Sequence, residues 1–142
     1  MQKILIVVSL LGLALASAAC GSGSGSGTNP GKVIKSAPAG NNLTVEIANP
    51  DGALKHGGTE FFLTFKDGSG KPVDVGAVAL NFYMPGMGTM APMNNAATFT
   101  TTETPGVYRG KANVEMAGEW QAQITFEGSA GKGQLNVPVT VQ

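Results

Sequence analysis

The feature that most constrains the fold is the alternation of apolar and polar residues between positions 41 and 142. Val78, Leu80 and Phe82, for example, are separated by single residues and would share one face of an extended strand. A period of two is typical of a half-buried β-strand, and turns containing glycine or proline interrupt the pattern at short intervals. The alternation therefore predicts an all-β fold, an immunoglobulin-like antiparallel β-sandwich of about seven strands.

The first residues of the chain differ from this pattern and are typical of a secretory signal peptide. Lys3 precedes an apolar run over residues 4–15, and small residues follow that run. Cys20, the single cysteine of the chain, comes directly after them, as in a bacterial lipobox, although Ser17 stands where that pattern usually has leucine. We therefore expect a signal peptide over residues 1–19 and a lipid on Cys20. Cleavage that leaves a free thiol is the alternative.

Residues 20–40 are rich in glycine and serine, which predicts a flexible tether between the lipid and the folded domain. The remaining stretch, residues 41–142, has the length of one ordinary domain. The lipid and its tether would hold that domain at a membrane, on the periplasmic side or at the cell surface. The sequence thus predicts an extracytoplasmic, membrane-anchored lipoprotein.

The chain has nine lysine and arginine residues and nine aspartate and glutamate residues, and the basic ones form no patch. Nucleic acid is therefore not an expected partner. The one histidine, His56, and a lipidated Cys20 leave no nucleophile and base that would act as a catalytic pair. We expect a protein that is not an enzyme.

The most unusual run lies between Met84 and Met93, where methionine recurs at every third position. Proline and glycine between the methionines exclude a helix, so we expect an irregular or extended loop. Soft thioether sulfurs displayed on such a loop favour Cu(I), or Ag(I) as its surrogate. The candidate metal ligands are Met84, Met87, Met90 and Met93, with His56 as an additional one.

Two other interpretations of the methionines stay open. Met84 is in phase with Leu80 and Phe82 and fits the core by pattern, and the other three methionines could fold over the end of the sandwich as an apolar plug. They could also form a soft surface for a partner protein. His56 stands in a loop, where an exposed histidine without a ligand role is the common case.

Several short motifs give the domain a resemblance to a known family. In chain order they are a Gly68–Val73 loop, a Met84-Pro-Gly-Met87 run, a Pro105-Gly-Val-Tyr-Arg109 turn and an Ala117-Gly-Glu-Trp120 segment. Together they resemble the YtkA-like domain family, which is related to FixH and to domains found with heavy-metal efflux adaptors. The resemblance covers nearly the whole folded domain.

The resemblance implies an immunoglobulin-like sandwich outside the cytoplasm, often associated with copper or with respiratory oxidases. The family's methionine positions map onto Met84 and Met87, whereas Tyr108 and Trp120 match positions that look structural. We expect a lipid-anchored Cu(I)-binding protein that sequesters copper or delivers it to a copper-accepting protein. The second hypothesis is a non-metal accessory module whose methionine loop docks onto a membrane efflux or oxidase assembly.

Overall fold

The computed structural model describes residues 28–142 of the chain, and the expected signal peptide and the lipid on Cys20 lie outside these residues. The described part contains nine strands and no helix. The strands are β1 (Lys32–Gly40), β2 (Leu43–Asn49), β3 (Gly57–Lys66), β4 (Ala77–Met84), β5 (Met93–Ala96), β6 (Thr98–Thr101), β7 (Val107–Val114), β8 (Gly118–Gly128) and β9 (Gly131–Val141).

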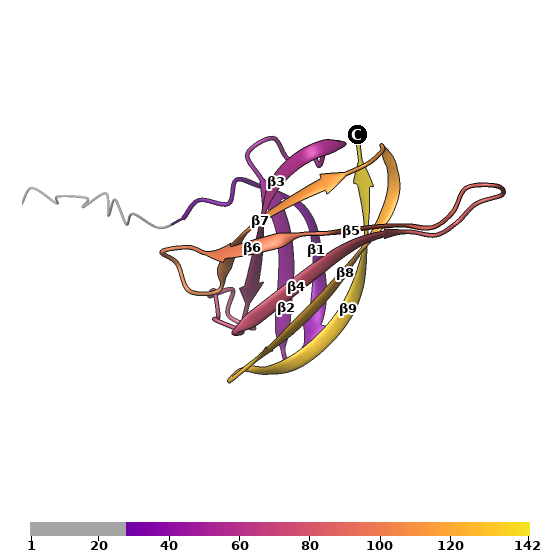
Figure 1. Cartoon of the computed structure of the whole chain (residues 1–142). Coiled ribbons are helices and arrows are strands. Elements are labelled where there is room, and N and C mark those ends of the chain that lie inside the picture. Colours follow the sequence, from indigo (N-terminus) through magenta and orange to yellow (C-terminus); the bar gives the residue numbers. More distant parts are fainter. Residues whose placement is uncertain (1–27) are drawn as a thin grey trace, which may run out of the picture.

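These strands form two antiparallel sheets that pack face to face (Figure 1). One sheet has the strand order β1-β2-β3-β7-β6, and the other has the order β5-β4-β8-β9. The predicted all-β sandwich is confirmed, with nine strands in place of about seven. Within residues 28–142, no helix has the length and apolar character needed to span a bilayer.

The core lies between the sheets and is built from the residues that the alternation places on one face of each strand. In β4, for example, Leu80, Phe82 and Met84 are all buried. Trp120 of β8 is 1% exposed, and its Nε1–H donates to the carbonyl oxygen of Met116 at 3.0 Å. Because that indole nitrogen has a partner, the ring is buried without an unpaired donor.

The sandwich begins earlier in the chain than residue 41. Lys32–Gly40, which its composition assigned to the tether, forms β1 and pairs along its length with β2. In this edge strand Ala39 is the one buried residue, and Pro38 has no N–H to donate, so its sequence lacks the alternation of a half-buried strand. Pairing with β2 places these residues in the sheet, and the order of apolar and polar residues within the segment does not reveal such pairing.

Between β5 and β6 the chain passes from one sheet to the other. β5 pairs with β4, whereas β6 pairs with β7, and the N–H of Ala97 between them donates to the carbonyl oxygen of Leu80 at 2.9 Å. The threonine-rich strand β6 lies at the edge of its sheet. This crossing holds β5 beside β4, so the chain between them forms a hairpin.

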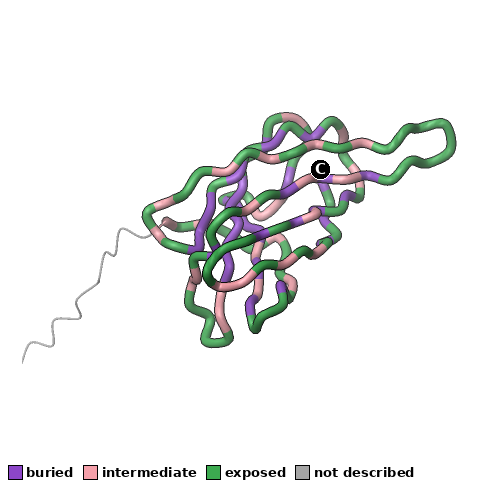
Figure 2. The backbone as a smooth tube through the Cα atoms, turned by 60° about the horizontal axis from the view of Figure 1, so that its bottom comes forward, coloured by how far each residue is buried: buried purple, intermediate pink, exposed green. Residues whose placement is uncertain are grey.

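The two ends of the sandwich differ in shape. At one end the hairpin between β4 and β5 projects well beyond the body of the domain (Figures 1 and 2). At the other end lies Thr28, the first described residue, whose N–H donates to the Oγ1 of Thr104 at 3.0 Å in the turn between β6 and β7. The described chain therefore starts at the end opposite the hairpin.

A hydrogen-bonded tyrosine fastens the end of the sandwich opposite the hairpin. The hydroxyl of Tyr108 donates to the carboxylate of Asp74 at 2.9 Å and accepts from the N–H of Val75 at 3.1 Å. Burial and the bond to Asp74 raise the pKa of Tyr108 to about 12. Bonds from the N–H of Gly76 and from Tyr108 lower the pKa of Asp74. These groups tie the segment before β4 to β7.

Candidate functional site

The candidate site is the hairpin between β4 and β5, and we call residues Met84–Met93 the methionine arm. β4 and β5 pair up to Met84 and Met93, and Met87 pairs with Met90 three residues further out on each side. The arm leaves the edge of the sandwich as a narrow two-stranded ribbon (Figure 1). The loop expected from the sequence is therefore extended, and it is more regular than its prolines and glycines suggest.

Gly88 and Thr89 form a two-residue turn that closes the tip of the arm. Met87 donates its N–H to the carbonyl oxygen of Met90 at 3.2 Å, and Met90 donates back to Met87 at 2.9 Å. Gly88 has a φ of +57°, whereas Thr89 does not have a positive φ. A type II′ hairpin turn has glycine at its first central position for this reason, so the local sequence suits the turn.

Small residues and prolines shape the middle of the arm. Pro85 and Pro92 have no N–H, and the backbone pairing is interrupted between the base of the arm and its tip. A Cβ atom on Gly86 would lie 2.9 Å from the carbonyl oxygen of Met90 and 3.1 Å from the Cδ of Pro92. The two sides of the arm thus approach as closely as they do because Gly86 has no side chain.

The methionines of the arm form two pairs with different surroundings. Met84 lies in the core and is 4% exposed, and Met93 is partly buried against the core. We call these two residues the base pair. Met87 and Met90 are 63% and 46% exposed, and we call them the tip pair. Figure 2 shows the outer part of the arm as exposed. The structure divides the four candidate ligands into pairs and does not bring all four together.

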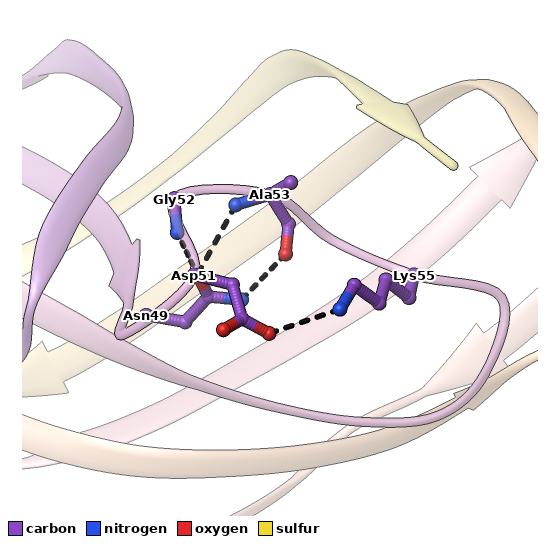
Figure 3. A network of polar contacts seen from close by, with 5 residues as sticks. All are labelled: Asn49, Asp51, Gly52, Ala53 and Lys55. Carbon is purple, nitrogen blue, oxygen red and sulfur yellow. Dashed lines mark hydrogen bonds and ion pairs between the residues drawn. The ribbon is translucent and has the colours of Figure 1, made fainter.

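His56 follows a loop that the side chain of Asn49 holds in shape (Figure 3). The Nδ2 of Asn49 donates to the carbonyl oxygen of Ala53, and its Oδ1 accepts from the N–H of Gly52, both at 2.6 Å. The Nδ1 of His56 lies 3.0 Å from the backbone oxygen of Gln142. His56 therefore lies beside the C-terminal end of the chain, which both views show set back from the tip of the arm.

Elsewhere in residues 28–142, no three side chains of histidine, cysteine, aspartate or glutamate gather where they could hold a metal ion. The carboxylate of Asp67 accepts from the hydroxyl of Ser69 at 2.6 Å and from the N–H of Lys71 at 3.1 Å. These bonds lower the pKa of Asp67 and close its own loop. The methionine arm is therefore the feature whose chemistry most needs an explanation.

The pairing of the methionines was not predicted above, although the sequence contains a signal for it. Met84-Pro-Gly-Met87 and Met90-Ala-Pro-Met93 are nearly mirror images about Gly88 and Thr89. In a hairpin with a two-residue turn, this symmetry places methionine opposite methionine and proline opposite proline. A mirror-symmetric segment around a glycine-containing dipeptide is the pattern that identifies such an arm.

The fold and the arm together define a class of protein, a β-sandwich domain that projects a methionine hairpin from one end. Within that class the chain belongs to the YtkA-like family, whose model matches residues 38–125, more than half of the chain. The match includes the arm and extends into β8. Comparison with curated proteins and with solved structures gave no match. Tyr108 and Trp120, which the resemblance maps to structural positions, both lie in the core.

Proposed function

We propose that this protein binds Cu(I) through the sulfur atoms of Met87 and Met90, and that it sequesters copper or delivers it to an acceptor protein. Ag(I) is expected to bind in the same way. The observation that carries the proposal is that both side chains lie exposed and opposite each other at the tip of a projecting arm. An extracytoplasmic lipoprotein anchored through Cys20 is part of the same proposal.

Packing within the domain does not explain the exposure of the tip pair. Burying a side chain of this kind stabilises a protein by about 1.5–3 kcal/mol, so methionine in solvent forgoes that gain. Among residues 28–142, the large apolar side chains that are exposed are those of Met87, Met90 and Val33. Two of these three face each other across one turn, as a pair of ligands would.

The pairing of Met87 with Met90 suits the chelation of one ion. Residues that exchange both backbone hydrogen bonds have Cα atoms about 5.5 Å apart and carry their side chains on the same face of the ribbon. Methionine is unbranched and flexible, so two such side chains can bring their sulfur atoms to one point. Cu(I) and Ag(I) are soft ions that prefer thioether sulfur.

The chemistry of the arm also suits a compartment outside the cytoplasm. Thioethers carry no proton, so binding to them does not compete with protonation, and they form no disulfides. Residues 85–92 include no charged side chain. Hard cations such as Mg²⁺ and Ca²⁺, which prefer carboxylate oxygens, therefore have no carboxylate ligand on the arm.

The test is an anaerobic titration of the protein with Cu(I) against a chromophoric competitor. Every sample carries Cys20→Ser, because a free thiol would itself bind Cu(I) and hide the weaker thioether site. We expect saturable binding that the double substitution Met87→Leu/Met90→Leu abolishes, since leucine keeps the apolar volume but has no sulfur. The same double variant should keep its free energy of unfolding within about 0.5 kcal/mol, because both side chains are exposed.

The matched control is Met116→Leu, which replaces a partly buried methionine outside the arm. This variant should bind Cu(I) like the parent protein. Binding that persists in Met87→Leu/Met90→Leu would contradict the assignment of the ligands.

A second candidate function is a docking module without metal, and the exposed, uncharged tip favours it as well. The tip pair would then be an apolar contact for a membrane efflux or oxidase assembly. Leucine can replace methionine in such a contact but not in copper ligation. Loss of Cu(I) binding in the leucine variant therefore supports the first function, and an absence of Cu(I) binding in the parent protein supports the second.

A further inference from the structure

We infer that one Cu(I) ion joins two copies of this chain tip to tip, with Met87 and Met90 of each copy as its ligands. The inference rests on the proposed function and adds a partner to it. A second copy of the chain would complete a site that one copy builds only in part.

One arm supplies an incomplete set of ligands for the ion. Between the two methionines of the tip pair stand Gly88 and Thr89, and the remaining residues of the outer arm are proline, glycine and alanine. Met84 is buried in the core, and at the rise of an extended strand it lies roughly 10 Å inward from Met87. Met84 therefore cannot add its sulfur to an ion at the tip without leaving the core, and Met93, its partner on β5, lies at the same level of the arm.

His56 does not complete the set either. Its Nδ1 is bonded to the backbone oxygen of Gln142, and the backbone N–H of His56 donates to the same oxygen at 2.7 Å. Both bonds hold this residue against the end of the sandwich, which lies back from the tip (Figures 1 and 2). Among residues 28–142, the soft side chains at the tip are thus those of Met87 and Met90.

A Cu(I) ion at one tip would have too few ligands. A thioether is a neutral and weak donor, so a Cu(I) ion held by two of them keeps open coordination positions and its full positive charge. Further sulfur ligands would fill those positions. The most direct source of two more is an identical tip, which offers the same pair of sulfurs on the same face of its own ribbon.

The shape and charge of the arm allow that approach. Because the arm projects from the body, two tips can meet without contact between the two sandwiches (Figure 1). Residues 85–92 carry no charge, so two arms do not repel each other as like charges would. A two-fold arrangement would also cover the exposed apolar surface of both tip pairs.

The test measures molar mass under anaerobic conditions, by sedimentation or by light scattering after gel filtration. The full chain with Cys20→Ser is used, so that no disulfide can form the dimer. We expect a monomer without metal and a doubling of mass when half an equivalent of Cu(I) per chain is added. X-ray absorption at the copper edge should then report a shell of sulfur neighbours about twice as populated as one tip could provide.

The controls separate the possible failures. Met87→Leu/Met90→Leu should stay monomeric with Cu(I), whereas Met116→Leu should dimerise like the parent. If Cu(I) binds without any change in mass, the bridge is wrong and the proposed function stands. If Cu(I) does not bind at all, both fall. A dimer that forms without metal, or that persists in the double leucine variant, would overturn the bridge in favour of apolar docking.

Discussion

The base pair and the tip pair of the methionine arm have the same residue type and the same hairpin register, and they differ in almost everything else. Met84 and Met93 lie where β4 and β5 still rest on the sandwich, so their side chains pack against the core. Met87 and Met90 lie beyond the edge of the sheets, where no other strand covers them, and remain in solvent. Distance from the sandwich, and not residue type, decides which methionines are exposed.

A close contact shows how tightly Met84 of the base pair is packed. A Cβ atom on Gly118 would lie 3.1 Å from the Cε of Met84, so the methyl group of Met84 rests over a residue that has no side chain. Packing of this kind holds a thioether in place as firmly as any aliphatic side chain. The tip pair has no such neighbours, and its order comes from two backbone hydrogen bonds.

The largest expected effect comes from Met84→Ala. Because Met84 is buried, its truncation should lower the free energy of unfolding by about 2–5 kcal/mol through lost contacts and a new cavity. Met87→Ala should change the same quantity by less than about 0.5 kcal/mol. Urea unfolding measures both, and equal effects would show that the two pairs do not differ as described.

The stability of the sandwich should depend on pH through Tyr108, which lies in the body of the domain and not in the arm. The pKa of Tyr108 is raised to about 12, so the folded state holds this proton more tightly than the unfolded state. The stabilisation is complete below the ordinary tyrosine value of about 10 and should be lost as the pH rises toward about 12. The free energy of unfolding, measured across this pH range, should decrease in the parent protein and decrease less in Tyr108→Phe. An unchanged pH dependence in that variant would contradict the assignment to Tyr108.

A smaller effect is expected from Met84→Leu/Met93→Leu. Leucine nearly conserves the volume of methionine, so the loss of stability should be below about 1.5 kcal/mol. Cu(I) affinity, measured by the competition titration, should not change, because the proposed ligands are the tip pair. A clear loss of Cu(I) affinity at unchanged stability would show that the base pair contributes to the metal site.

The smallest expected change in stability comes from mild oxidation with hydrogen peroxide. Sulfoxides should form first on Met87 and Met90 and last on Met84, because exposure controls access of the oxidant. Peptide mass spectrometry identifies the order, and the free energy of unfolding should stay within about 0.5 kcal/mol while Cu(I) binding is lost. Equal oxidation of base and tip pairs would argue against their different burial.

Some parts of this fold follow directly from local sequence. The alternation in Val78, Leu80 and Phe82 predicts a half-buried strand, and this strand is β4. β1 was not predicted, because an edge strand with one buried residue carries no pattern of its own. β5 was not predicted either, since Met93 to Ala96 belongs to a strand only through its pairing with β4.

Local sequence is enough to specify the all-β class, the exclusion of a helix between Met84 and Met93, and the presence of four soft sulfurs in that stretch. These are properties of residue type and local spacing, which no partner element can change. The packing of Met84 and Met93 and the exposure of Met87 and Met90, in contrast, arise from the tertiary fold. Burial depends on where the edge of the sandwich falls across the hairpin, and that edge is set by strands far away in the chain, β8 among them.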